Sequence, residues 1–402
     1  MTHKSSNSSV QNSGKPRGIS RAGRPITQAV LTICAVYALC GQCLAQDWQT
    51  LNPGVEYAAV TKEISGLNVS INLLRVDPTK ARLEVAHAFD RAIGVDTTSN
   101  IAKTHGAIAA INSGFFRLDT SAWAGDPAGM LMIDGQLLSE PEKNRTQLLI
   151  NNGRRSSDVF IDKLQLKMRV RFADTELPIA GVDREAEGDE IVMYTPEFGQ
   201  STMTKPGTFE VVVINGKVAS ISPGLPNSVI PAKGYVLSAT GSLRDQLRAA
   251  TDKSSRVYLS NEWTGVDNGV IRSFDQERRN WDIVAGVPQL IKDGKIDIPW
   301  EAEKSTKSFV ETRHPRTAVA KLKDGKFLMI TVDGRSESSG GIGLQDLAEY
   351  LLSLGATDAL NLDGGGSTTM WIDGKGVVNH PSDKEGERKV SDALLVTFRK
   401  KN

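Results

Sequence analysis

The sequence predicts a mixed α/β fold of the α+β type, in which several β-sheets and a few helices surround a central strand–helix–strand unit that ends in three glycines. One observation behind this prediction is a helical period over residues 343–354, followed by a strand pattern over 358–363 and by Gly364–Gly366. Another is a series of short alternating segments over 156–284, punctuated by proline and glycine, which predicts a β-rich insertion. Sheets and helices of this kind pack in layers around shared apolar faces.

The first 45 residues differ in composition from the rest of the chain. Residues 1–24 are basic and rich in serine and asparagine, and we expect them to be disordered. Residues 26–45 are apolar and end in Cys43-Leu44-Ala45, which is typical of a secretory signal peptide with small residues at its cleavage site. The alternative is an uncleaved anchor, since 26–45 is long enough to span a membrane. In both cases we expect residues 46–402 to be secreted or periplasmic.

Composition limits the classes of protein to consider. The chain has 402 residues, of which 39% are hydrophobic and 24% charged, so we expect a packed core of one large or two ordinary domains. Five of the 48 basic residues and none of the 47 acidic ones lie in residues 1–45, so the remainder has 43 basic residues against 47 acidic ones. Nucleic-acid binding needs a concentrated positive face, and this balance therefore argues against it. All three cysteines lie in 26–45, so a cleaved chain would contain no disulfide.

Between residues 55 and 112 the pattern predicts four strands and one helix. Alternating apolar residues mark the strands, and a polar cap marks the helix. In chain order these are strands 55–60, 69–76 and 82–87, a helix at 98–105 and a strand at 107–111. The last strand is buried and runs directly into Asn112-Ser113-Gly114. A side-chain amide at the end of a buried strand serves either a ligand or a structural turn.

Downstream of the insertion, strands are expected over 318–323 and 327–332, before the helix 343–354. Leu344, Leu347 and Leu351 recur on one face of that helix, as in a helix packed on a sheet. A glycine follows the helix, where a left-handed cap is usual.

The run Gly364–Gly366 requires an explanation, because glycine loses more backbone freedom on folding than any other residue. One interpretation is a backbone that passes close to a ligand, with its N–H groups forming a concave nest for an oxyanion. The alternative is a tight hairpin turn between strands 358–363 and 367–372. The run is not a nucleotide-binding P-loop, since no Gly-Lys-Ser/Thr ending follows it.

Several polar blocks near strand ends resemble the signature of the phosphodiester glycosidase family. The main block is Asn361-Leu-Asp-Gly-Gly-Gly-Ser-Thr-Thr-Met370 with its preceding helix, and shorter blocks match at 110–116, 314–319 and 332–335. The resemblance covers roughly residues 48–398, and one departure is Ser113, where the family more often has glycine. It implies that residues 46–402 form a hydrolase domain that cleaves a sugar-1-phosphodiester. One family member removes N-acetylglucosamine from a phosphodiester on mannose.

The residues themselves fit this chemistry if the strand ends meet in one crevice. Carboxylates stabilise the sugar cation and deliver water, and a histidine transfers protons near neutral pH, so the expected catalytic residues are Asp333, Asp363 and His314. Guanidinium groups and backbone amides bind phosphate oxygens. The expected substrate-binding residues are Asn112, Arg316, Arg335, Asn361, Gly364, Gly365, Gly366 and Ser367. For either arginine alone a structural ion pair is an alternative, and for His314 a structural turn.

Other ligands and activities remain open at the level of sequence. Asp333, Asp363 and Asn361 offer oxygen ligands suited to Ca²⁺ or Mg²⁺, whereas no spacing resembles a zinc site. The expected partner is a phosphorylated glycan or sugar phosphodiester of the cell envelope or of an extracellular polysaccharide. No nucleic acid is expected, and a membrane only through 26–45 if that segment is uncleaved. The alternatives are a phosphodiesterase that cuts the P–O bond, and a non-catalytic polysaccharide-binding protein of envelope assembly.

Overall fold

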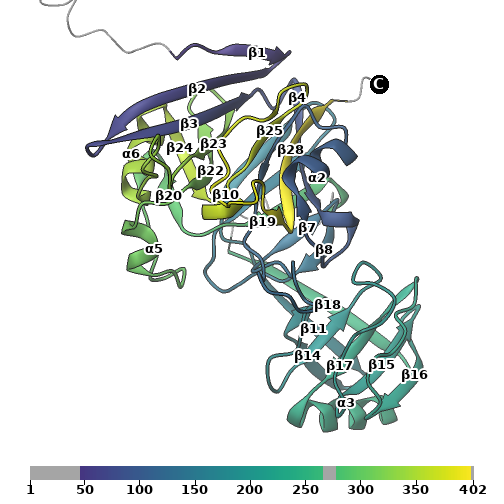
Figure 1. The fold of residues 1–402 in the computed structure, drawn as a ribbon. Coiled ribbons are helices and arrows are strands. Elements are labelled where there is room, and N and C mark those ends of the chain that lie inside the picture. Colours follow the sequence, from purple (N-terminus) through teal and green to yellow (C-terminus); the bar gives the residue numbers. More distant parts are fainter. Residues whose placement is uncertain (1–45, 266–277, 400–402) are drawn as a thin grey trace, which may run out of the picture. The chain divides into compact units, whose positions relative to one another are not determined.

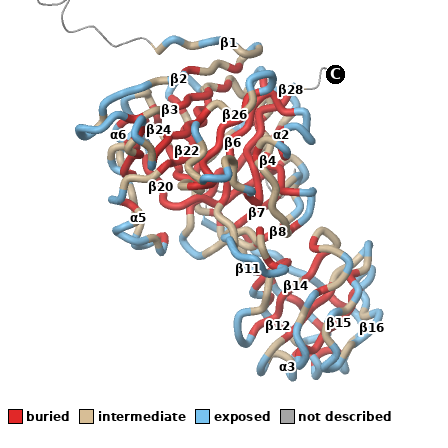
Figure 2. Tube along the Cα trace, viewed as in Figure 1, coloured by how far each residue is buried: buried red, intermediate tan, exposed pale blue. Residues whose placement is uncertain are grey.

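Two antiparallel sheets packed through one apolar cluster carry the residues of the expected site (Figure 1). The computed structural model describes residues 46–265 and 278–399, so the predicted tail and signal segment of residues 1–45 lie outside the described residues. Within the described part, no helix combines the length and the apolar character that a bilayer crossing requires. Figure 2 shows that buried residues concentrate along the strands of these sheets.

The larger sheet has eight strands, and each hydrogen-bonds its neighbours in antiparallel fashion. Their spatial order is β1 (Gln49–Asn52), β2 (Val55–Ile64), β3 (Leu67–Val76), β23 (Phe327–Val332), β22 (Arg316–Leu322), β24 (Ala356–Asn361), β20 (Gln289–Lys292) and β21 (Lys295–Ile296). Successive side chains of a strand point to opposite faces. Accordingly Val319 of β22 joins the cluster between the sheets, while Ala318 and Ala320 join the cluster under the helices α5 (Lys307–Glu311) and α6 (Leu344–Ser353).

The second sheet covers the other side of the shared cluster. Its order is β26 (Gly376–Val377), β25 (Met370–Ile372), β6 (Ala109–Asn112), β28 (Asp392–Phe398) and β4 (Ala81–His87). Its outer face packs on α2 (Thr98–Thr104), whose first turn is capped by the Thr97 hydroxyl accepting from the backbone N–H of Asn100. A two-stranded pair joins β5 (Asp96–Thr97) to β27 (Lys389–Val390).

A third sheet of five strands extends the apolar cluster. It has the order β10 (Ser157–Asp162), β9 (Gln147–Asn152), β19 (Trp281–Ala285), β7 (Leu131–Ile133) and β8 (Gln136–Ser139). The strands β10 and β19 therefore pair with β9, although β10 and all of β19 except Ala285 fall within the range 156–284 that was predicted as an insertion.

Residues 165–264 form two further sheets around an apolar cluster of their own, and we call this segment the insertion. One sheet is β12 (Thr175–Ile179), β11 (Gln165–Phe172) and β18 (Val257–Thr264); the other is β13 (Gly181–Val182), β14 (Ile191–Tyr194), β17 (Gly234–Ala239), β15 (Phe209–Ile214) and β16 (Lys217–Pro223). The helix α3 (Gly241–Lys253) packs on them. The pair β13–β14 is parallel, so this sheet is mixed. The predicted β-rich α/β character is confirmed in this coarse form.

The predicted hairpin alternative for the glycine run is wrong. The expected strand 358–363 is β24, which pairs with β20 and β22 of the larger sheet. The expected strand 367–372 is reduced to β25, which pairs with β6 and β26 of the other sheet. Between them Gly365–Ser367 form one 3₁₀ turn, η3. The glycines therefore carry the chain from one sheet to the other.

Candidate active site

Antiparallel pairing brings the predicted site segments together. The first residue of β22, Arg316, lies opposite Val332 at the end of β23, and on its other side β22 pairs with the end of β24. Residues just before β22 and just after β23 and β24 therefore meet at one edge of the sheet. The end of β6 in the second sheet reaches the same place, because the backbone N–H of Asn112 donates to the carbonyl of Thr369 (3.2 Å).

Each of the three glycines is required for a different reason. A Cβ on Gly364 would lie 2.7 Å from the carbonyl oxygen of Pro315. Gly365 has a φ of +61°, which is strained for residues with a side chain. A Cβ on Gly366 would lie 2.1 Å from Nη2 of Arg388. The sequence predicts that the glycine run lies close to another group. Gly364 lies close to the backbone of Pro315, and Gly366 lies close to the side chain of Arg388.

We expect Gly364→Ala to lower the free energy of unfolding by about 1–3 kcal/mol, because overpacking against a fixed backbone oxygen moves the strand ends apart. Urea unfolding measures this change. Gly153→Ala is the matched control, since the nearest atom to its Cβ would be 3.5 Å away. Equal stability of the two variants would contradict the tight approach at Pro315.

A pocket of about 240 Å³ opens at this edge. Its lining combines four cationic or imidazole side chains, one carboxylate, one aromatic ring and the glycine run: Phe309, His314, Arg316, Arg335, Asp363, Gly364, Gly365, Gly366 and Arg388. Seven of the eleven predicted site residues therefore line one hollow, as the sequence requires if widely separated blocks serve one ligand.

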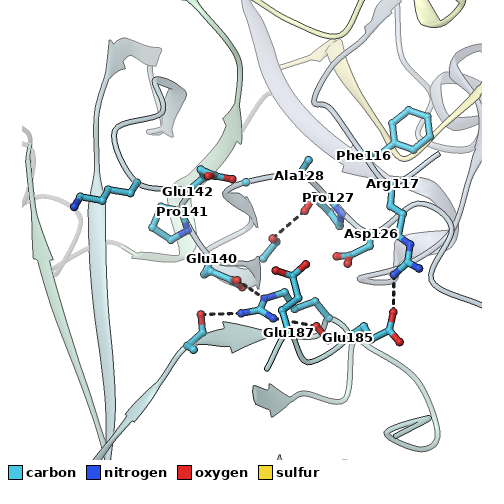
Figure 3. A pocket seen from close by; sticks show the side chains of 15 residues that line it. Phe116, Arg117, Asp126, Pro127, Ala128, Glu140, Pro141, Glu142, Glu185 and Glu187 are labelled. Atoms are coloured by element: carbon cyan, nitrogen blue, oxygen red, sulfur yellow. Dashed lines mark hydrogen bonds and ion pairs between the residues drawn. The ribbon is translucent and has the colours of Figure 1, made fainter. Parts of the chain in front are cut away.

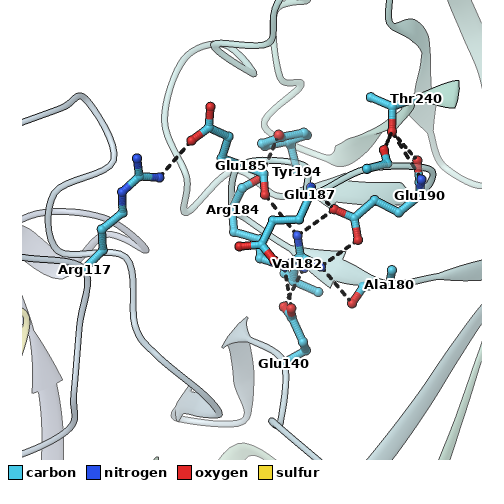
Figure 4. Close-up of polar contacts among 11 residues, drawn as sticks. Arg117, Glu140, Ala180, Val182, Arg184, Glu185, Glu187, Glu190, Tyr194 and Thr240 are labelled. Carbon is cyan, nitrogen blue, oxygen red and sulfur yellow. Dashed lines mark hydrogen bonds and ion pairs between the residues drawn. The ribbon is translucent and has the colours of Figure 1, made fainter.

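A larger cavity, of about 680 Å³, is lined by residues between Phe116 and Glu187 (Figure 3). Its arginines are compensated by carboxylates of the chain itself. Arg184 pairs with Glu140 (2.5 Å) and Glu190 (2.8 Å), and Arg117 pairs with Glu185 (2.8 Å) (Figure 4). In the smaller pocket Arg388 has such a pair, with Asp383 (2.7 Å), but Arg316 and Arg335 form no ion pair with a carboxylate of the described residues, so we place the candidate site there.

Arg316 is buried, with 1% of its surface exposed. Its Nε donates to the carbonyl of Ile342 (3.3 Å), and its Nη2 donates to those of Phe309 (2.6 Å) and Thr312 (2.9 Å). No carboxylate of the described residues forms an ion pair with it. Burial, followed by the charge of Arg335, lowers its pKa to about 10, so it stays protonated at neutral pH. A buried charge without a counter-charge is costly, and an anion in the pocket would compensate it.

Arg335 and His314 form a more exposed part of the lining. Arg335 has a φ of +59° and an exposed side chain whose Nη2 donates to Nδ1 of His314 (3.4 Å). Burial and then the charges of Arg316 and Arg335 lower the pKa of His314 below its usual value. The imidazole is therefore neutral at neutral pH, with Nδ1 as an acceptor.

Hydrogen bonds of its backbone N–H and of its carbonyl hold Asp363 in place. Its N–H donates to the carbonyl of Ser113 (3.0 Å), and its carbonyl accepts from Nδ2 of Asn112 (2.7 Å). Burial raises the pKa of its carboxyl group to about 6, and the Ser367 hydroxyl and the Gly364 N–H oppose that shift. The carboxyl group is thus mostly ionised at pH 7 and above, in the lining of a positively charged pocket.

Three predicted binding residues lie behind the pocket lining. The Oδ1 of Asn112 accepts from the hydroxyl of Thr317 (2.7 Å) and from the N–H of Thr369 (3.1 Å), so its amide joins both sheets. The Nδ2 of Asn361 donates to the carbonyls of Val287 (2.7 Å) and Leu362 (2.9 Å). Ser367 is buried beside the carboxyl group of Asp363. The structure places all three as supports of the site segments.

Asp333 also lies outside the pocket lining. Its Oδ1 accepts from the backbone N–H of His380 (3.0 Å) and from Nδ2 of Asn379 (3.3 Å), and burial raises the pKa of its carboxyl group. Within residues 46–265 and 278–399, no group of three or more His, Cys, Asp or Glu side chains is arranged to hold a metal ion. Of the possible metal ligands Asp333, Asp363 and Asn361, Asp363 alone lines the pocket.

No sequence signal distinguishes two of the lining residues, Phe309 and Arg388. The ring of Phe309 lies 4.7 Å from the guanidinium carbon of Arg316 and stacks edge-on against Phe115. Arg388 lies in a polar loop after β26, where neither period nor spacing distinguishes it from other surface charges.

The sequence profile of a family described as "Phosphodiester glycosidase" matches residues 208–397, which include the pocket lining. Residues 208–397 are therefore a phosphodiester glycosidase domain. Among similar proteins is the SPbeta prophage-derived uncharacterized protein YomE of Bacillus subtilis, with 40% identity over 27% of this chain and 16% of that protein. N-acetylglucosamine-1-phosphodiester alpha-N-acetylglucosaminidase of Bos taurus is 36% identical over 27% of this chain and 22% of that enzyme. The matches thus span less than a quarter of either relative's length.

A solved structure of a hypothetical protein from Synechocystis has the same fold as this phosphodiester glycosidase domain and its surroundings. It superposes with a TM-score of 0.74 and 23% identity, over 88% of this chain and 64% of that one. The shared fold includes most of the chain upstream of residue 208, which the family profile does not match.

Proposed function

We propose that the protein hydrolyses the glycosidic bond of a sugar-1-phosphodiester. The observation that carries this proposal is Arg316, a buried guanidinium without a carboxylate partner among the described residues, which lines a pocket shared with Arg335, Arg388 and the glycine run. A phosphodiester supplies the missing negative charge, and its oxygens suit the forked donors of arginine. The membership of residues 208–397 in the phosphodiester glycosidase family supports the same activity.

The chemistry needs little acid assistance, because phosphate is already a good leaving group. In the proposed reaction the bond between the anomeric carbon and the phosphate oxygen breaks, and water supplies the hydroxyl group of the free sugar. Ionised Asp363 stabilises the positive charge that develops on the sugar, and activates water or attacks the sugar carbon itself. The arginines stabilise the charge left on the phosphate. His314, neutral and bonded to Arg335, accepts or orients a proton at the pocket mouth.

The biological setting that we propose follows from the sequence. An apolar segment at 26–45 suggests export, so a polysaccharide of the cell envelope or an extracellular polysaccharide is the proposed source of the substrate. The bovine relative is named for N-acetylglucosamine, which makes a diester of N-acetylglucosamine-1-phosphate the first compound to test.

Hydrolysis in water enriched in ¹⁸O tests the proposal directly. Cleavage of the C–O bond places the label in the free sugar and leaves an unlabelled phosphomonoester, which mass spectrometry of the products detects. Label in the phosphate would instead identify a phosphodiesterase that cuts the P–O bond. Binding of the diester in calorimetry without any product would indicate a polysaccharide-binding protein.

A further inference from the structure

A loop of residues 379–388 passes over the glycine run and is held at both ends. At one end Oδ1 of Asn379 accepts from the N–H of Met370 (2.7 Å), and Nδ2 donates to the carbonyl of Thr368 (3.0 Å). At the other end the carboxylate of Glu387 accepts from the N–H (2.7 Å) and the hydroxyl (2.6 Å) of Ser99. The 379–388 loop therefore has a fixed position above Gly366.

This loop contributes an ion pair between its middle and its last residue to the edge of the pocket. Nε of Arg388 donates to Oδ2 of Asp383 (2.7 Å), and Nη2 donates to Oδ1 (3.0 Å). A Cβ on Gly366 would lie 2.1 Å from this guanidinium and 2.3 Å from Oδ1 of Asp383, so the pair lies directly on the glycine. Asp383 occupies one edge of the guanidinium. Nη1 has no hydrogen-bond partner among the described residues, so it can donate to a ligand in the pocket that Arg388 lines.

The charges around the pocket add up to a small positive value. Arg316, Arg335 and Arg388 contribute three positive charges, and His314 is neutral at neutral pH. Asp363 in the lining and Asp383 on Arg388 contribute two negative charges. The net charge of +1 matches a phosphodiester, which carries one negative charge. A phosphomonoester carries about −1.5 to −2 at pH 7 and is a poorer match.

We infer that Asp383 is a specificity-determining residue, which lowers the charge of the pocket so that it prefers phosphodiesters over phosphomonoesters. This inference rests on the proposed function and goes beyond it. Hydrolysis turns a diester with one negative charge into a phosphomonoester, whose second charge develops beside Asp363 and Asp383. The carboxylate of Asp383 therefore weakens retention of the product, while its two bonds keep Arg388 in place for the substrate.

The test compares the binding of dimethyl phosphate and methyl phosphate by calorimetry at pH 7.5 and low salt. Asp383→Asn keeps the size of the side chain and one acceptor for Arg388, but raises the pocket charge to +2. We expect the dissociation constant of methyl phosphate to fall about tenfold relative to that of dimethyl phosphate, on the scale of one unit charge in a partly solvated site. Arg388→Gln lowers the pocket charge and is expected to shift the ratio the other way. Glu176→Gln, which removes one carboxylate of an exposed ion pair in the insertion, is the control.

An unchanged ratio in Asp383→Asn would overturn the inference, as would equal weakening of both ligands, which would show that Asp383 only positions Arg388. Failure of both phosphates to bind the unchanged protein would overturn it as well. The ¹⁸O experiment reports separately on hydrolysis. A protein that binds the phosphates with the expected ratio but forms no product would contradict the proposed function alone.

Discussion

Asp363→Asn is expected to reduce hydrolysis of a sugar-1-phosphodiester by about a thousandfold or more, the scale of losing a carboxylate that acts in the transition state. The amide keeps the shape of the side chain but cannot stabilise a sugar cation or activate water. The backbone contacts of residue 363 with Asn112 and Ser113 do not involve the carboxyl group, so the fold is retained. Because burial raises the pKa of this carboxyl group, the neutral amide is also expected to make the protein at least as stable at pH 7.5.

The pH dependence provides a second measurement on the same residue. The carboxyl group of Asp363 has a pKa of about 6 and acts in its ionised form, so the rate is expected to rise with pH through about 6 and to fall as acid protonates it. The small residual rate of Asp363→Asn should lack this acid limb. Calorimetry with dimethyl phosphate serves as the control, since the arginines still bind it. Activity within tenfold of the unchanged protein would remove Asp363 from the mechanism.

The second large effect is expected at Asn112, which is completely buried and bonds to both sheets. Asn112→Ala leaves the carbonyl of Asp363, the hydroxyl of Thr317 and the N–H of Thr369 without their partners. An unsatisfied buried polar group costs about 1–3 kcal/mol, and some of the three can recover a partner by small shifts. We therefore expect the free energy of unfolding to fall by about 3 kcal/mol, together with a loss of kcat.

Urea unfolding followed by circular dichroism measures the stability change. Asn100→Ala is the matched control, because Asn100 is exposed on α2 and its side chain donates to Asp96 alone among the described residues (3.1 Å). We expect the control to change stability by less than about 0.5 kcal/mol. A loss below about 1 kcal/mol for Asn112→Ala would show that the amide does not join the sheets as described.

The sequence predicts well those helices and strands that depend on local periodicity. The helix expected at 343–354 is α6 (Leu344–Ser353), because its apolar face repeats with the period of a helix packed on a sheet. The strands before it are equally clear. The conformation of Gly364–Gly366 depends instead on which sheets β24 and β25 join. Pairing between strands that are distant in the sequence leaves no local pattern, so the sequence does not predict it.

The roles of Asn112 and Asn361 show a second limit. A buried amide at the end of a strand fits a ligand and a backbone partner equally well, and the choice depends on carbonyls contributed by residues 287 and 363. Arg388 shows the opposite case, since it reaches the pocket because the 379–388 loop is tied down at Asn379 and Glu387. The residues next to Arg388 in the sequence therefore do not predict that its side chain lines the pocket.

The insertion leaves and rejoins the rest of the chain through two adjacent strands. β11 and β18 pair antiparallel from Gln165 opposite Thr264 to Phe172 opposite Val257, so the exit and the return of the chain lie side by side. The spacing between these two points is fixed by their own hydrogen bonds and does not depend on what lies beyond them. The part of the insertion beyond the β11–β18 pair can therefore be shortened or replaced, in evolution or by design, while Arg316, Arg335 and Arg388 keep their positions relative to the glycine run.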